Sequence, residues 1–157
     1  MNSDDVRTAP KADALPLLGV RVLEVGPGQG VAFAGKLFAD FGAEVIKVEP
    51  PQGDELRAWP PQVDTGHGPD SAYFAWLNTN KRSVTADASQ PEDRAWMGQL
   101  AASSDIVLDA RALGELGLAA LDDPLVPASA AHQPVTAKLT WFGDSGPYRN
   151  FVGGDAV

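Results

Sequence analysis

The chain has 157 residues, of which 44% are hydrophobic, and its 21 acidic against 12 basic residues give a formal net charge of -9. This length allows one globular domain with a real core, and the acidic balance disfavours a nucleic-acid partner because phosphate backbones would be repelled. The sequence has no cysteine, which excludes disulfides, thiolate zinc sites and a cysteine nucleophile. The two histidines, His67 and His132, fall in predicted loops without a neighbouring carboxylate pattern, so we predict no metal site.

Residues 1–14 mix charged with small side chains and contain no apolar core of seven or more residues. A signal peptide or a membrane anchor needs such a core, so we expect a disordered tail followed by one domain over residues 15–157. No other stretch approaches the roughly twenty apolar residues of a membrane-spanning helix. We therefore expect a soluble protein without a membrane partner, and cytoplasm is the default location.

The first elements in chain order form one β–α–β unit. A β-branched run over residues 20–25 predicts a buried strand of a parallel sheet. Apolar residues at three- and four-residue spacing predict a helix over 31–41, and Gly42 supplies its C-terminal stop. A second strand is predicted over 44–48, closed by a pair of prolines. The alternation of strand, helix and strand is typical of α/β proteins.

The rest of the chain continues the α/β order. Prolines and glycines break the segment 51–69, which we expect to be an irregular functional loop. Pro91 is well placed as the first residue of a helix, with Ser89 as its cap. The predicted elements are a helix over 71–77, a helix over 91–102, a strand over 105–108 and a strand over 135–141. We predict a Rossmann-like parallel sheet with flanking helices.

A glycine-rich turn follows the first predicted strand. The run VLEVGPGQG, residues 22–30, is similar to the loop of S-adenosylmethionine-dependent methyltransferases, and Glu49 ends the next strand where such enzymes bind the ribose hydroxyls. Glycines let a backbone approach a ligand, and the helix N-terminus beyond them offers unpaired N–H groups. A dinucleotide fingerprint is disfavoured because its third glycine falls on Val31. Any parallel βα unit also needs a glycine turn, so a methyltransferase remains one alternative.

Four separate blocks of the sequence carry a stronger signal than this turn. They are residues 15–25, 37–59, 71–87 and 141–157. In the same order they resemble the family III CoA-transferases, the group of carnitine dehydratase and formyl-CoA transferase. The third block contains the run NTNKRS, which matches the family's Asn-x-Asn-Lys-Arg-Ser signature. The joint order of the blocks is far more specific than any one of them.

The resemblance implies a protein that transfers CoA from an acyl-CoA to a carboxylic acid. The family's nucleophile is an aspartate that forms mixed anhydrides with acyl groups and a thioester with CoA, and it follows the segment that residues 141–157 resemble. The resemblance therefore implies the N-terminal part of such an enzyme, with CoA as substrate and no covalently bound cofactor, truncated before the catalytic Asp segment and inactive alone. Family members form interlaced dimers, so we expect a homodimer or association with a C-terminal half. A non-catalytic, degenerate half that serves as an interaction module is the second alternative.

The resemblance also points to individual residues, none of them catalytic. Gln29 falls where formyl- and oxalyl-type members have a glutamine lining the active site, and its amide could bind a substrate carboxylate; a loop glutamine facing water is the alternative. Arg57 matches a recurrent family arginine that either steadies an anionic group or pairs with Asp54 or Glu55.

The best-matched cluster is Asn80, Lys81 and Arg82, together with Asn78. Two adjacent cations beside amides imply contacts to CoA phosphates or to a neighbouring subunit, and solvated surface charge is the alternative. We therefore predict CoA-binding residues at Asn80, Lys81, Arg82 and Arg57. The aromatic side chains within 73–76 are expected to pack in the core.

Several positions depart from the family pattern. The family has a Glu-Asn-Phe-x-Pro-Gly turn that contacts CoA. Residues 109–118 replace it in this chain, and this segment is about three residues shorter than in the family. Ser89 and Pro50 stand where formyl-CoA transferases have a lysine and an arginine, so we expect weak CoA binding. Asp155 matches an acidic hinge position, but Gly154 replaces the histidine of the racemase members, which argues against epimerisation at an α-carbon.

Overall fold

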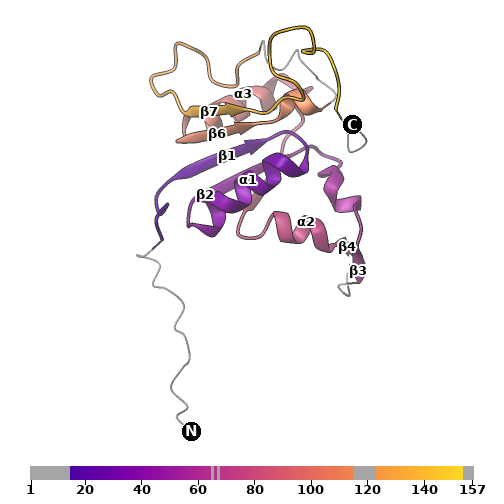
Figure 1. Cartoon of the computed structure of the whole chain (residues 1–157). Coiled ribbons are helices and arrows are strands. Elements are labelled where there is room, and N and C mark those ends of the chain that lie inside the picture. The colour runs from indigo at the N-terminus through magenta and orange to yellow at the C-terminus, as the bar shows by residue number, and fades with distance from the viewer. Residues whose placement is uncertain (1–14, 65, 67, 115–122, 154–157) are drawn as a thin grey trace.

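The computed structural model describes residues 15–64, 66, 68–114 and 123–153. Their main feature is a five-stranded parallel sheet in the order β5-β2-β1-β6-β7 (Figure 1). Its strands are β1 (Arg21–Val25), β2 (Glu44–Glu49), β5 (Arg82–Thr85), β6 (Ile106–Asp109) and β7 (Val135–Lys138). The helices are α1 (Gln29–Asp40), α2 (Ala72–Leu77) and α3 (Pro91–Ala102). The predicted parallel sheet with flanking helices is confirmed.

Alternating side chains of β1 divide the core into two layers. Val22 lies in one hydrophobic cluster with Val31 of α1, and Leu23 lies in a second cluster with Met97 of α3. Because successive side chains of a strand point to opposite faces of its sheet, α1 covers one face and α3 the other, with α2 packed beside α1 (Figure 1). The strands are parallel, so the turns that follow β1, β2 and β6 all lie at the same carboxyl edge of the sheet.

The segment 51–69, predicted to be irregular, contains short regular elements. They are the 3-10 turn η2 (Glu55–Ala58) and the antiparallel pair β3 (Gln62–Asp64) and β4 (Pro69–Ser71). The Asp54 carboxylate caps η2 by accepting a hydrogen bond from the Leu56 N–H at 2.8 Å, and Leu56 is fully buried. The prediction was wrong here because elements of three or four residues carry no hydrophobic periodicity.

Strand β5 is the one strand of the sheet that the sequence pattern does not predict. Its residues are mostly exposed, because it pairs with β2 on one side only and forms an edge of the sheet. Strand β7 forms the other edge and ends at Lys138, three residues before the predicted end, with all four residues exposed. Both errors concern edge strands, whose apolar content is low.

The helix ends differ from the prediction in two details. Helix α1 begins at Gln29 rather than at residue 31, because Gly28 takes the N-cap position with a φ of 109°. Pro91 begins α3 as predicted, but Gln90 and not Ser89 occupies the N-cap position, and the Ser89 N–H donates to the Asp87 carboxylate instead. Gly42 ends α1 in the left-handed conformation, as predicted.

No helix within the described ranges is long and apolar enough to cross a membrane. The second short 3-10 turn, η3 (Arg111–Leu113), follows β6. The tail 1–14, His67, and the positions Gly154 and Asp155 lie outside the described residues.

Candidate functional site

The turn after β1 places Gln29 at the carboxyl edge of the sheet. Gly26 and Gly28 have φ angles of 98° and 109°, which glycine adopts without strain, and a Cβ at Gly26 would collide with the backbone of Ala110. Gln29 begins α1 with an exposed side chain, and its Oε1 accepts a hydrogen bond from the Tyr73 hydroxyl at 2.7 Å. The Nε2 group has no partner within the described ranges, so the amide keeps an unused hydrogen-bond donor.

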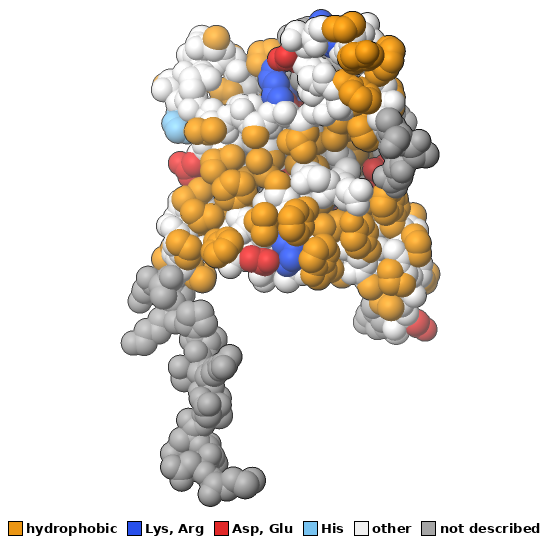
Figure 2. All heavy atoms as spheres, in the orientation of Figure 1, with side chains coloured by type: hydrophobic (Ala, Val, Ile, Leu, Met, Phe, Trp, Pro, Cys, Tyr) orange, Lys and Arg blue, Asp and Glu red, His pale blue; other side chains and the backbone are white. Residues whose placement is uncertain are grey.

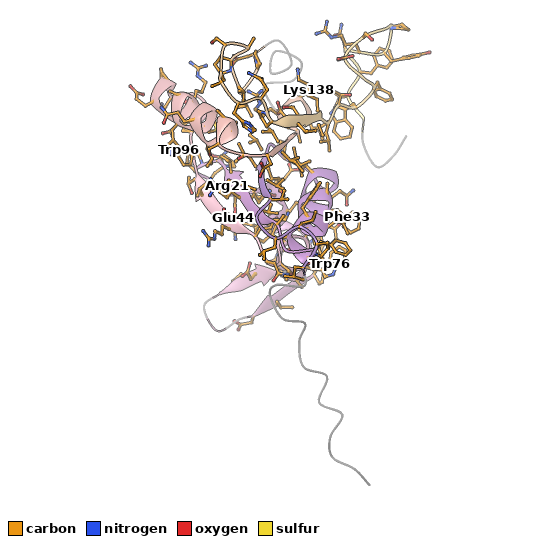
Figure 3. All side chains as sticks on the ribbon, turned by 90° about the vertical axis from the view of Figure 1, so that its left-hand side faces the viewer. Arg21, Phe33, Glu44, Trp76, Trp96 and Lys138 are labelled. Atoms are coloured by element: carbon orange, nitrogen blue, oxygen red, sulfur yellow. The ribbon has the colours of Figure 1, made fainter. Side chains whose placement is uncertain are left out.

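Four aromatic rings form a stacked row beside Gln29. The ring centroids are 6.1 Å apart between Trp59 and Tyr73, 6.3 Å between Tyr73 and Trp76, and 5.9 Å between Trp76 and Phe33. Phe33 and Trp76 lie next to each other on one side of the molecule (Figure 3). Figure 2 shows hydrophobic side chains gathered over the face that carries α1 and α2.

The aromatic side chains of α2 are more exposed than predicted. Phe74 is buried, as predicted. Tyr73 is only half-buried, and Trp76 is 51% exposed. Core packing was therefore the wrong prediction for Trp76, because the six-residue helix turns only one of its sides toward α1.

Between the sheet and α1 lies a buried charge quartet, formed by Glu24 of β1, Lys47 of β2, Asp54 and Lys81. Lys47 Nζ donates to Glu24 Oε1 at 2.8 Å and to Asp54 Oδ2 at 2.6 Å, and Lys81 Nζ donates to Glu24 Oε2 at 2.7 Å. Each of these side chains is at most 4% exposed. The two positive and two negative charges balance, as burial requires.

The two lysines of the quartet differ in how well their charge is compensated. Burial disfavours the charged form of both. Burial lowers the pKa of Lys81, because Glu24 compensates only part of it. Burial acts in the same direction on Lys47, but Glu24 and Asp54 together outweigh it and raise its pKa. Helix α1 makes room for these groups at Gly35, where a Cβ would collide with the Glu24 carboxylate.

Arg57 is held by Glu49 at the end of β2. Two parallel hydrogen bonds of 2.8 and 2.9 Å join the guanidinium to the carboxylate, which also accepts from the Asp54 N–H and the Ser83 hydroxyl. Burial alone would raise the pKa of Glu49, but these donors lower it to about 2. The partner of Arg57 is therefore Glu49 and neither Asp54 nor Glu55 as predicted.

This pairing bears on the methyltransferase alternative. Four donors use both oxygens of Glu49, so the carboxylate offers no acceptor site to a ribose hydroxyl. The glycine turn is accounted for by the close approach of Gly26 to Ala110. The methyltransferase reading is not favoured.

The predicted CoA-binding residues do not gather with Gln29. Lys81 is buried in the quartet, whereas Asn80 and Arg82 line a shallow pocket of about 330 Å³ at the amino ends of β1 and β2, the opposite edge of the sheet from Gln29. Asn80 Nδ2 donates to Asp40 Oδ1 at 3.1 Å. Arg82 is 75% exposed and pairs with Glu44 at 2.9 Å. The signature run thus places neighbouring residues in two different environments.

The described residues after β6, at the start of the segment that departs from the family signature, are held by Arg111. Arg111 donates to both oxygens of Asp109 at 2.9 Å and to the Asp123 carbonyl at 2.8 Å. The sequence shows that the Asn and Phe of the family turn are absent, but it does not predict the ion pair between Arg111 and Asp109. Over the part of the chain that the structure describes, no group of three or more His, Asp or Glu residues could hold a metal ion, and His132 lies against the Ser104 carbonyl.

Sequence reasoning also missed the quartet, although one signal in the sequence was available. Glu24 and Lys47 interrupt two β-branched apolar runs with opposite charges, and they are register partners on neighbouring strands. Opposite charges within two buried strands of one β–α–β unit favour a buried ion pair.

The elements and the site define a Rossmann-like α/β domain with an exposed amide and an aromatic row at one end of a parallel sheet. The family model for CoA-transferase family III matches residues 17–157. The chain belongs to this family. The family assignment made from the four sequence blocks is confirmed.

Similar proteins of known sequence or structure support this family assignment. The chain is 36% identical over 146 residues to a succinate–glutarate CoA-transferase of Agrobacterium fabrum, covering 90% of this chain and 36% of the relative. It is 38% identical to a succinyl-CoA–D-citramalate CoA-transferase of Chloroflexus aurantiacus, covering 88% of this chain and 34% of the relative. A CaiB/BaiF family protein of Brucella suis has a similar structure, with a TM-score of 0.74 at 36% identity over 89% of this chain and 37% of that one. The chain therefore spans about a third of the length of these relatives, their N-terminal part.

Proposed function

We propose that this chain is the N-terminal part of an enzyme that transfers CoA from an acyl-CoA to a carboxylic acid. The observation that carries the proposal is the family match over residues 17–157. Similar proteins are named for succinate with glutarate and for succinyl-CoA with D-citramalate, so dicarboxylic acids are the proposed substrate class. The proposed nucleophile is an aspartate that this chain does not supply.

The contribution of this chain to the chemistry is binding and orientation. Gln29 Nε2 is the donor proposed to hold a carboxylate or thioester oxygen, since its Oε1 is already used by Tyr73. A neutral amide suits this task because it can bind both the charged acid and the uncharged thioester. Arg57 is proposed to act indirectly, by fixing the loop after β2 through Glu49.

The CoA-binding residues remain a prediction, and the structure separates them into exposed and buried side chains. Asn80 and Arg82 are exposed and border one pocket, which supports them as contacts for a phosphate or a neighbouring subunit. The Lys81 side chain is buried, and after β6 the Arg111 guanidinium is occupied by the Asp109 carboxylate. We therefore propose that this chain alone binds CoA weakly.

Association and location are further parts of the proposal. Exposed aromatic side chains cluster within residues 141–152 and are Trp141, Phe142, Tyr148 and Phe151. Such a patch favours burial against further protein, either a second copy in a homodimer or a separate C-terminal half. A cytoplasmic location is proposed with it, and cell fractionation tests it.

A chimaera tests the proposed function directly. The matched N-terminal part of the Agrobacterium relative is replaced with residues 17–157, and transfer of CoA from succinyl-CoA to glutarate is measured by chromatography. We expect activity in the chimaera and a loss of about 10- to 100-fold in kcat/KM on Gln29→Ala, the range of one hydrogen bond to a charged group. A folded but inactive chimaera would instead support the non-catalytic, degenerate half.

A thermal-shift assay addresses the remaining alternative. A ligand present at 100 times its Kd stabilises a protein by about 2.7 kcal/mol, so S-adenosylhomocysteine at high concentration would raise the Tm of a methyltransferase by several degrees. We expect no shift with this ligand.

A further inference from the structure

The ammonium group of Lys81 joins three elements of the fold. Its Nζ donates to Glu24 Oε2 on β1 at 2.7 Å, to the Ala32 carbonyl in α1 at 2.7 Å, and to Asn78 Oδ1 at the end of α2 at 2.9 Å. An ammonium has three N–H groups, so these contacts use all of them. The side chain is 2% exposed, and no donor is left for a phosphate.

Two of the three elements carry the residues of the candidate site. Helix α1 begins with Gln29, and the carbonyl that Lys81 holds belongs to Ala32, in the first turn of that helix. Helix α2 carries Tyr73, whose hydroxyl binds Gln29 Oε1. Lys81 therefore fixes the start of α1 relative to the helix that orients the Gln29 amide.

Charge balance alone does not explain this arrangement. Glu24 requires a cation because it is fully buried, and Lys47 and Lys81 both supply one, each through one hydrogen bond. The other two bonds of Lys81 go to neutral oxygens, the Ala32 carbonyl and the Asn78 amide. They fix the relative position of α1 and α2, which is a geometric function.

We propose that Lys81 is a positioning residue for Gln29 and not a contact to CoA. By holding the first turn of α1 against the end of α2, it keeps the Tyr73 hydroxyl on Gln29 Oε1 and leaves Nε2 directed to the substrate oxygen. The assignment rests on the proposed role of Gln29 in CoA transfer. It gives the lysine of the Asn-x-Asn-Lys-Arg-Ser run a role distinct from that of its neighbour Arg82.

The test observes the Gln29 side chain in the unliganded chain. Its amide protons give a pair of signals in a proton–nitrogen correlation spectrum, and the signals are assigned by their disappearance in Gln29→Ala. Tyr73→Phe gives the reference position for an amide that has lost its hydrogen bond. We expect Lys81→Met to shift the Gln29 signals toward that reference position. We also expect it to accelerate amide hydrogen exchange at least tenfold over residues 33–36, whose N–H groups donate to the carbonyls of the first turn of α1.

A second variant keeps the test valid if Lys81→Met fails to fold. In the double variant Glu24→Gln with Lys81→Met, the buried charges of Lys47 and Asp54 remain balanced, so the fold has no unpaired charge. The double variant removes the bond to the Ala32 carbonyl, and we expect the same shift of the Gln29 signals. Arg21→Met is the control, because Arg21 pairs with Glu44 at the amino edge of the sheet, and it should leave the Gln29 signals in place.

Two outcomes would overturn the proposal. Gln29 signals that stay unchanged in the folded double variant would mean that Lys81 does not position the amide. Titration of CoA into the wild-type chain that moves the Lys81 side-chain signals, and is abolished by Lys81→Met, would make Lys81 a CoA contact. An inactive chimaera combined with responsive Gln29 signals would count against the proposed enzyme function while leaving the positioning role in place.

Discussion

Two sets of charged side chains on the same sheet behave in opposite ways. The buried charge quartet lies between the sheet and α1 with each side chain at most 4% exposed. The other set, Arg21, Glu44 and Arg82, lies at the amino edge, where Arg21 is 41% and Arg82 75% exposed. Hydrogen-bond lengths are similar in the two sets, at 2.6–2.8 Å and 2.9 Å. Burial and not distance therefore decides which charges the fold depends on.

The difference in burial separates two adjacent residues of the Asn-x-Asn-Lys-Arg-Ser run. Lys81 belongs to the buried set and Arg82 to the exposed set, because side chains that are neighbours along an extended chain point to opposite sides. Lys81 and Arg82 are adjacent in the Asn-x-Asn-Lys-Arg-Ser motif, but one side chain is buried and the other lies on the surface.

Removing a cation from the buried set should give the largest effect. Lys47→Met leaves Glu24 and Asp54 with Lys81 as their only buried cation, and breaking a buried pair in this way costs about 3–5 kcal/mol. Urea unfolding followed by tryptophan fluorescence measures the change in the free energy of unfolding. A loss below about 1 kcal/mol would mean that water reaches these charges and that the two sets are not different in kind.

Acid should destabilise the chain through Glu49, which is as buried as the quartet. Its folded pKa of about 2 lies below the ordinary value of 4.5, so its contribution is present above pH 4.5 and is lost as the pH falls toward 2. The full change amounts to about 3 kcal/mol, of which about 2 kcal/mol is lost by pH 3. Between pH 7 and pH 3, the free energy of unfolding should fall accordingly in the wild type and less steeply in Glu49→Gln. The slope in Glu44→Gln should equal that of the wild type. Equal slopes in all three proteins would contradict the assignment.

The space that α1 leaves for the quartet can be tested at one glycine. Gly35→Ala places a Cβ against the Glu24 carboxylate, and overpacking of this kind costs about 1–3 kcal/mol. Gly30→Ala is the matched control on the same helix, since its Cβ would meet only Leu139 at an ordinary contact distance of 3.8 Å. We expect the control to be neutral or to stabilise by up to about 1 kcal/mol, because alanine favours helix. A lower Tm for Gly30→Ala than for Gly35→Ala would refute the packing argument.

Changes in the exposed set should give the smallest effect. Arg82→Ala removes a pair that is screened by water, and we expect a loss of at most about 0.5 kcal/mol. A salt titration provides the check, because any residual effect should vanish at high ionic strength. A destabilisation above about 2 kcal/mol would place Arg82 with the buried charges.

The sequence predicts the fold wherever apolar side chains recur with a clear period. The runs around Val22 and Val45 show both strands of the β–α–β unit, and the glycine at position 42 shows the end of the first helix. The edge strands β5 and β7 could not be predicted as well, because a strand with exposed side chains lacks that pattern.

The candidate site was predictable only in part. Gln29 was predicted only through the resemblance to formyl- and oxalyl-type family members. Its hydrogen bond to Tyr73 joins residues 44 positions apart and leaves no local trace in the sequence. The pairing of Arg57 with Glu49 was missed for a related reason. The predicted partners were the nearest acids along the chain, whereas the turn after β2 brings the guanidinium back to the strand end.

Strand β7 has a consequence for handling the protein. It pairs with β6 on one side, no strand of the described residues pairs with its other side, and Val135 on it is 71% exposed. An uncovered strand edge recruits strands from other molecules, which leads to aggregation. Preparations of this chain should therefore become less monodisperse as the protein concentration rises.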